Sequence, residues 1–323
     1  MGGNIRIAGE GIAGSPLAIL LMRQGFRFGP QPQDCHFWAS PARRPTAFAV
    51  SLLLLLMLLF VLQPAWASTN PPIPPNSLDD GFNRMYELKF PAAREVFQAY
   101  IANHPADPMG QVSLAASYLF EEFNEHGVFT SAFFLNDQKL LGGIPNPGDD
   151  AYRARFLEAN SRARQMAQDL LNANPNDPMG LFVITLANGM EADYDALIAK
   201  RDMASLLLLR ETQKSARKLL AINPQADDAY LALGAANYII GCLPGYKRFF
   251  LSLGGIHGSR QLGMHQLELA AKGGHYLKPF AKVMLALAAL RERQPGMARN
   301  LFSELHDQFP ENDVFASELA KLH

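Results

Sequence analysis

Cysteine is scarce in this chain, and net charge is nearly absent. The 323 residues contain two cysteines, Cys35 and Cys242, and no Cys-x-x-Cys pair. The two lie far apart on opposite sides of an apolar run, which excludes a disulfide framework and a zinc site built on paired cysteines. Twenty-nine basic residues against 30 acidic ones leave a net charge of −1. The chain therefore lacks the basic field that collects nucleic acid, and no nucleic-acid partner is expected.

Charge is missing altogether from one segment. The sixteen residues from Ala47 to Leu62 carry none, and Arg43-Arg44 precede them. Ala65-Trp66-Ala67 then places small residues where a signal peptidase reads, so residues 44–67 are predicted to be a secretory signal peptide. The 21 residues from Ala47 through Ala67 also fit an uncleaved transmembrane anchor, which needs about 20 apolar residues. Either form places the rest of the chain outside the cytoplasm, periplasmic or anchored in the inner membrane.

A glycine motif stands near the N-terminus. Gly9-x-Gly11-x-x-Gly14 follows a short apolar stretch and precedes a helical one, within residues 4–25. This resembles the start of a Rossmann dinucleotide-binding fold, in which the glycines admit a pyrophosphate to a helix N-terminus. That fold needs a second strand ending in an acid, and residues 26–31 contain none. We interpret residues 1–43 as an N-terminal extension rather than a working domain, and we expect no cofactor.

A short phrase recurs in the remainder of the chain. HPADPMG at 104–110 returns as NPNDPMG at 174–180, with weaker copies at 223–230 and 309–316. In each copy a proline ends one helix, and an aspartate lies near the N-cap of the next. The proline-rich residues 68–78 ahead of the first helix are predicted to be an extended linker.

The residues before each of these prolines also repeat. Three positions, 12, 8 and 5 residues ahead, hold mostly small and then apolar side chains: Ala93, Phe97 and Tyr100 before Pro105; Ala163, Ala167 and Leu170 before Pro175; Thr212, Ala216 and Leu219 before Pro224; Ala298, Phe302 and Leu305 before Pro310. This pattern resembles the second helix of a tetratricopeptide repeat, and the chain resembles exported bacterial proteins of that kind. The resemblance implies an all-α fold over residues 79–323, a right-handed α-α superhelix (a TPR-like solenoid), and it brings no reaction with it.

The spacing of the prolines departs from the family. They stand 70, 49 and 86 residues apart, whereas the repeat period is about 34 residues. Long insertions are therefore expected. The predicted helix pairs are 79–89 with 91–103, 108–124 with 148–173, 178–197 with 202–221, 227–240 with 259–272, and 277–292 with 295–308, followed by a capping helix at 312–322.

The first helix of each pair should line the concave face of such a solenoid, where partners usually bind. Candidate partner-binding residues on these helices are Tyr118, Glu122, Asn188, Tyr194, Tyr230 and Tyr238. This polar, aromatic and mildly acidic set would suit a protein or peptide with basic or amide groups. The competing interpretation is a solvated helix face with core tyrosines.

Two insertions, 125–148 and 241–258, are too apolar for free loops. The second contains the further candidates Lys247, Arg248, Phe249 and Phe250. Either the insertions fold back to cover the hydrophobic groove, or they form a contact patch for a protein or a membrane surface, for example as a two-loop clamp. Lys247 and Arg248 beside two phenylalanines would suit an anionic lipid headgroup.

Catalytic patterns are weak. No His-x-x-x-His or Glu-x-x-His pair places two metal ligands on one helical face, and Ser259 fits the start of a helix better than a nucleophile site. We expect Cys242 to be buried and inert, and the chain to be a non-catalytic scaffold. The alternatives are a membrane-anchored assembly factor, or an enzyme that uses either the glycine motif as a flavin-binding remnant or a Cys242–His257 dyad.

Overall fold

The computed structural model describes residues 74–144, 150–253 and 255–322, which form helices and connecting loops without a strand. All of them belong to one compact unit, Asn70–His323. The predicted signal or anchor at 44–67 and the glycine motif at 9–14 lie outside the described residues. Within the described ranges, no helix combines the length and apolarity needed to cross a bilayer.

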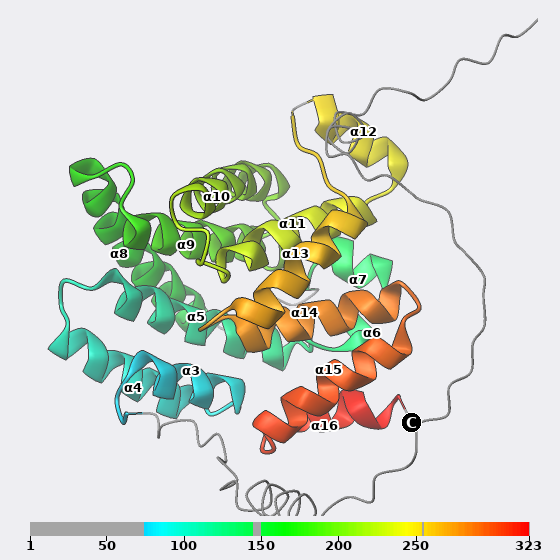
Figure 1. Cartoon of the computed structure of the whole chain (residues 1–323), viewed down its shortest axis with the longest axis horizontal. Helices are drawn as coiled ribbons and strands as arrows, with labels where there is room; N and C mark the ends of the chain where they lie inside the picture. The colour runs from blue at the N-terminus through cyan, green and yellow to red at the C-terminus, as the bar shows by residue number, and fades with distance from the viewer. Residues whose placement is uncertain (1–73, 145–149, 254, 323) are drawn as a thin grey trace, which may run out of the picture. The chain divides into compact units, whose positions relative to one another are not determined.

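Most of these helices form antiparallel pairs that follow one another along the chain (Figure 1). The pairs are α3 (Leu78–Tyr86) with α4 (Phe90–Asn103), α5 (Pro108–Glu125) with α8 (Asp150–Ala173), α9 (Pro178–Leu197) with α10 (Asp202–Ile222), α11 (Ala229–Cys242) with α13 (Arg260–Gly273), and α14 (Lys278–Arg291) with α15 (Pro295–Gln308). The second helix of each pair packs on the first helix of the next. The predicted all-α repeat architecture is confirmed, with differences of a few residues at helix ends; the handedness of the superhelix stays a prediction.

The two strong copies of the recurring phrase start α5 and α9 as predicted, whereas Asp228 in the weaker copy at 223–230 makes no side-chain cap on α11. Asp107 caps α5 by accepting a hydrogen bond from the Met109 N–H at 2.9 Å, and Asp177 caps α9 by accepting one from the Gly180 N–H at 2.7 Å. In both helices a proline occupies the first turn, where its missing N–H costs no hydrogen bond. Ser259 likewise caps α13 through the Leu262 N–H.

The small residues of the repeat form the seam between helices. Ala93, Ala163, Ala216 and Ala298, one on each of four second helices, have no solvent exposure. Neighbouring apolar positions are equally buried, for example Phe97 and Phe302 at 0%. Because an alanine side chain ends at Cβ, the paired helix can approach closely and fill the space beside it. The repeat pattern in the sequence therefore marks the core.

Helices α11 and α13 approach each other closely at two glycines. A Cβ on Gly263 would lie 2.5 Å from the Tyr238 nitrogen, and one on Gly241 would lie 2.6 Å from the Arg260 nitrogen. Neither distance is compatible with a side chain. These glycines are therefore selected for close backbone contact between the two helices.

The two ends of the array meet. The Asn312 side chain donates a hydrogen bond to the Tyr86 carbonyl at 2.7 Å, and the Tyr86 ring packs on Phe309 at 5.5 Å. The Tyr86 hydroxyl donates to the Tyr276 carbonyl at 2.8 Å. The first pair therefore contacts the turn before α14 and the turn before α16 (Asp313–Ala320).

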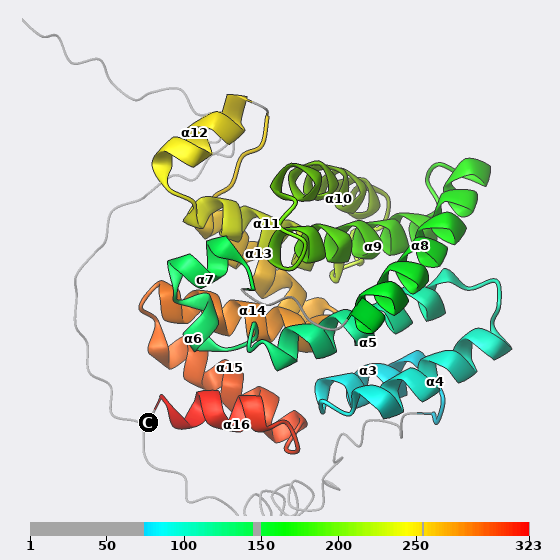
Figure 2. The same ribbon diagram turned by 180° about the vertical axis from the view of Figure 1, so that it is seen from behind.

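The two insertions differ in structure. The first forms α6 (Ser131–Phe134) and α7 (Asp137–Gly142), and the second forms α12 (Gly245–Leu253). Phe133, Phe134 and Ile144 in the first are at most 5% exposed, whereas α12 has no buried residue. In both views α12 projects from the array, while α6 lies beside α14 (Figures 1 and 2). The first insertion thus folds back as capping requires, and the second does not.

Candidate functional site

The first insertion covers surfaces of several first helices. The Phe129 ring packs on Phe120 of α5 and on Phe280 of α14, with ring centroids 5.2 and 5.6 Å apart. Phe134 stacks on Tyr238 of α11, with a centroid distance of 6.1 Å. The Ile144 N–H donates a hydrogen bond to the carbonyl at the end of α9, at Leu197, 2.7 Å away. A large part of the surface expected to receive a partner is therefore occupied by the chain itself.

Gly143 makes this return possible. Its φ angle is 69°, and a Cβ there would lie 2.6 Å from the Leu197 carbonyl oxygen. Both the left-handed backbone and the close contact demand glycine. The next residue, Ile144, can then enter the core at 1% exposure.

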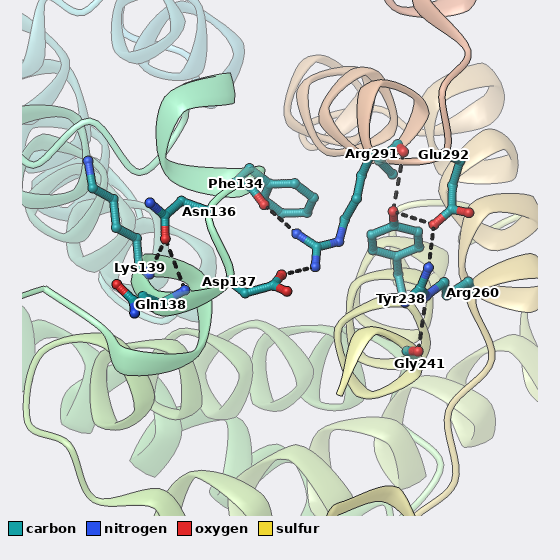
Figure 3. A network of polar contacts seen from close by, with 11 residues as sticks. Phe134, Asn136, Asp137, Gln138, Lys139, Tyr238, Gly241, Arg260, Arg291 and Glu292 are labelled. Carbon is teal, nitrogen blue, oxygen red and sulfur yellow. Dashed lines mark hydrogen bonds and ion pairs between the residues drawn. The ribbon is translucent and has the colours of Figure 1, made fainter. Parts of the chain in front are cut away.

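A polar network fixes the bases of both insertions to the end of α14 (Figure 3). The Arg291 guanidinium donates to the Phe134 carbonyl at 2.9 Å and also pairs with Asp137. The adjacent Glu292 accepts a hydrogen bond from the Tyr238 hydroxyl at 3.0 Å and pairs with Arg260 at 3.4 Å. At the end of α14, Arg291 therefore holds the first insertion, and the neighbouring Glu292 holds the start of α13, which follows the second insertion.

Cys242 lies at the base of the projecting insertion and is 7% exposed. Burial raises the pKa of its thiol, and the nearby Arg291 and Arg260 only partly oppose that effect. A thiol with a raised pKa is largely protonated near neutral pH and is a poor nucleophile. The side chain of His257 is exposed to solvent. The structure therefore provides no activating environment for the Cys242–His257 dyad, although reactivity itself is untested.

Most of the predicted partner-binding residues on first helices are in the interior. Tyr118, Glu122, Asn188, Tyr194 and Tyr238 are at most 7% exposed, and Tyr230 is half-buried. Arg94 covers the Tyr118 ring at 4.9 Å, and Phe156 packs on Tyr194 at 5.3 Å. The buried tyrosines thus support the core, as the competing interpretation expected, because tyrosine can bury its ring when a helix pair surrounds it. Glu122 and Asn188 are buried as well, whereas that interpretation expected a solvated polar face. Contact with a partner stays an untested prediction for them, and their burial disfavours it.

The four candidates of the second insertion are exposed instead. Phe249 and Phe250 are 61% and 66% exposed, and Lys247 and Arg248 are also on the surface. The two phenylalanine rings contact each other edge to face at 5.8 Å. The structure therefore brings these four residues together on one helix, apart from the tyrosines of the first helices.

A pocket of about 260 Å³ opens where three first helices begin. We call it the edge pocket. It is lined by the start of α9, the end of α10, the turn before α11 and the turn before α14, through Pro178, Met179, Phe182, Leu219, Asn223, Gln225, Ala226, Asp227, Asp228, Gly273, His275 and Tyr276. Met179 is 40% exposed, and Asp227 is partly buried. The lining thus combines apolar side chains, amides and a carboxylate.

Asp228 holds the shape of the edge pocket. Its carboxylate accepts hydrogen bonds from the backbone N–H groups of His275, Tyr276 and Leu277 at 2.8, 3.0 and 3.1 Å. Burial raises the pKa of Asp228, and these three donors oppose that rise. One carboxylate thereby ties the turn before α11 to the turn before α14 and fixes two walls of the pocket.

His275 and Tyr276 form the wall contributed by the turn before α14. The His275 ring stacks on Tyr276 at 4.1 Å, and Tyr276 stacks on Phe82 of α3 at 5.1 Å. His275 Nε2 lies 2.8 Å from Asp79 Oδ1. Burial raises the pKa of Tyr276 to about 12, with smaller contributions from nearby carboxylates. No group of three or more potential metal ligands gathers here or elsewhere among the described residues.

Sequence reasoning missed the edge pocket, and the recurring phrase carries no signal that would reveal it. Met109 and Met179 occupy the same place in the two strong copies of the recurring phrase. Met109 is 1% exposed in the core, whereas Met179 faces the pocket. The phrase alone could not distinguish them, because the difference comes from the helices that pack nearby.

Comparisons with known proteins leave the family open. No family model matches the chain, and no curated protein matches it. A similar solved structure is that of a thermophilic TPR protein from Thermus thermophilus, with 14% sequence identity and a TM-score of 0.39. The match covers 76% of this chain and 98% of that one. At this level the likeness assigns no function, and the repeat architecture rests on the helix pairs themselves.

Proposed function

We propose that this chain is a non-catalytic helical-repeat scaffold that binds a segment of a partner protein in the edge pocket. The observation that carries the proposal is an open pocket at the start of three consecutive first helices, in an array where the first insertion packs on other parts of the first helices. A repeat array commonly presents such surfaces to an extended peptide.

The lining of the pocket favours a particular partner chemistry. Met179 and Phe182 offer a flexible thioether and an aromatic ring to an apolar side chain. Asp227 can accept hydrogen bonds from a basic or amide group, and Asn223 and Gln225 lie at the rim. We therefore expect a short extended segment in which an apolar residue lies close to a lysine, arginine or amide-bearing residue.

The proposed place of action is outside the cytoplasm. It is supported by the uncharged run from Ala47 to Leu62 after Arg43-Arg44. If this segment is cleaved after Ala67, the scaffold is free in the periplasm; if it is retained, the chain is a membrane-anchored assembly factor. N-terminal sequencing of protein from the native host distinguishes the two, because the cleaved form begins at Ser68.

A photo-crosslinking amino acid at position 179 tests the pocket in the full chain expressed in its native host. The matched control places the same amino acid at Met203 on the outer side of α10, which is 71% exposed. We expect protein adducts specific to position 179. The charge reversal Asp227→Lys should abolish them, whereas Glu268→Lys on α13 should leave them unchanged.

The outcome that contradicts the proposal is equally definite. If positions 179 and 203 give the same adducts, the pocket has no preference for a partner. Adducts that persist in Asp227→Lys would show that the Asp227 carboxylate does not take part in recognising the partner.

A further inference from the structure

We propose that α12 is an interfacial helix that docks on an anionic lipid surface. The motivating feature is its pattern of side chains. Tyr246, Phe249, Phe250 and Leu253 stand at positions i, i+3, i+4 and i+7 of one helix. That spacing places all four on a single face.

This apolar face points to solvent. The four side chains are 64%, 61%, 66% and 71% exposed, and no residue of α12 is buried. An amphipathic helix of a globular domain normally turns such a face to the core. Here the helix projects from the array in both views (Figures 1 and 2), so the face is free to meet an external apolar phase.

The positive charge of α12 favours an anionic surface over a neutral one. Residues 243–259 contain Lys247 and Arg248 and no acidic residue. Neither side chain forms an ion pair with any described residue. By contrast, five arginines and two acids precede residue 68, which leaves a net charge of −4 on the remainder of the chain. Despite that acidic remainder, the basic, aromatic helix itself is complementary to anionic headgroups, with apolar side chains below and cationic ends among the phosphates.

The size of the face disfavours a second copy of the chain as the occupant. Four side chains at about two-thirds exposure offer roughly 500 Å², less than the ~800 Å² per partner of a stable protein interface. A lipid interface has no such threshold, because shallow insertion of a few aromatic side chains adds to electrostatic attraction.

The attachment of α12 suits this role. Arg260 Nε donates to the Gly241 carbonyl at 3.1 Å, and Arg260 also pairs with Glu292. These contacts fix the two ends of the projecting segment to the array. The apolar face can therefore enter a bilayer surface without disturbing the core, and it supplies an attachment point separate from residues 44–67.

Hydrogen exchange of the full chain with vesicles provides a local test. The amides of residues 245–253 are followed with phosphatidylcholine vesicles, with and without a minority of phosphatidylglycerol. We expect anionic vesicles to slow their exchange about tenfold or more, and neutral vesicles to slow it much less. Because the readout is local, membrane attachment through residues 44–67 does not by itself produce it.

Two pairs of variants sharpen the test. Phe249→Ser with Phe250→Ser should remove the slowing, whereas Met203→Ser with Leu207→Ser, which alters an exposed apolar pair on α10, should not. Lys247→Glu with Arg248→Glu should also remove it, whereas Arg210→Glu with Lys214→Glu, an equal charge change on α10, should not. All four positions on α12 are exposed, so these variants should fold normally.

Three results would overturn the proposal. The first is exchange in residues 245–253 that anionic vesicles do not change. The second is slowing that persists in both α12 variants. The third is slowing that appears without vesicles as protein concentration rises, which would identify another copy of the chain as the occupant.

Discussion

Arg291 should be the residue that keeps the first insertion closed. Its side chain is 13% exposed and bridges the Phe134 carbonyl, at 2.9 Å, and Asp137, whose side chain is 70% exposed. A hydrogen bond from a charged donor to a buried carbonyl contributes about 1.5–3 kcal/mol, whereas an ion pair with so exposed a partner contributes about 0–1 kcal/mol. The carbonyl contact is therefore expected to dominate.

The two contributions can be separated by substitution. Arg291→Ala should lower the free energy of unfolding by roughly 2–4 kcal/mol, since it also removes packing. Asp137→Ala should lower it by less than about 1 kcal/mol. Urea denaturation measures both values. Hydrogen exchange should in addition quicken in residues 131–142 of Arg291→Ala, because these residues form the segment that the guanidinium holds.

Either of two results would contradict this role of Arg291. Equal losses for Asp137→Ala and Arg291→Ala would show that the ion pair, not the carbonyl bond, secures the insertion. Unchanged exchange in residues 131–142 would show that Arg291 does not hold it at all.

Three further predictions concern the core and the pocket. Met109→Ala should lower the unfolding free energy by about 2–5 kcal/mol and Met179→Ala by less than about 1 kcal/mol, measured in urea, because only Met109 is buried; equal losses would contradict the assignment of Met179 to the pocket. Gly263→Ala should lower the melting temperature, since its Cβ would meet the Tyr238 nitrogen at 2.5 Å, whereas Gly296→Ala, with nothing within 4 Å, should not. Tyr276 has a folded pKa of about 12, above its ordinary value of 10.0, so its contribution to stability is full below pH 10 and is lost as pH rises through 12. The wild-type protein should therefore lose at most about 2–3 kcal/mol of unfolding free energy between pH 10 and pH 12 that Tyr276→Phe does not lose. Identical profiles of unfolding free energy against pH for the two proteins would refute the raised pKa of Tyr276.

Local chemistry allowed much of the fold to be predicted. Proline and aspartate in the recurring phrase located the helix boundaries, and Ala93, Ala163 and Ala298 identified the seam. These features act over one or two helical turns, so a linear pattern records them. The burial of Cys242 followed from composition in the same way.

Long-range contacts could not be predicted in this manner. Asn312 and Tyr86 close the array across 226 residues. Asn312 stands at the capping position of the recurring phrase and caps α16, but nothing in that local pattern predicts its second contact, with the Tyr86 carbonyl. The pocket forms where turns from separate repeats meet, and Asp228 gives no sign in the sequence of its bonds to residues 275–277. The burial of the tyrosines on first helices could not be predicted either, because helical spacing shows which residues share a face but not what covers that face.

The two insertions illustrate the difference most clearly. Both are rich in phenylalanine and glycine, and composition suggested the same behaviour for both. In the first, Gly143 permits a close return to α9, so Phe133, Phe134 and Ile144 enter the core. In the second, the aromatic residues share one face of a separate helix that has no surface of the array to cover. The arrangement of apolar residues, rather than their number, decides the outcome.

The central claim is that the first insertion is part of the core, whereas the second insertion, which contains α12, projects from the array without contributing to the core. The most direct measurement compares the unfolding free energies of two variants, one with residues 130–142 and the other with residues 244–257 replaced by a short Gly-Ser linker. The account predicts a loss of several kcal/mol for the first, since burying each large apolar side chain contributes about 1.5–3 kcal/mol, and less than about 1 kcal/mol for the second. A neutral first replacement, or a second replacement that unfolds the protein, would contradict it.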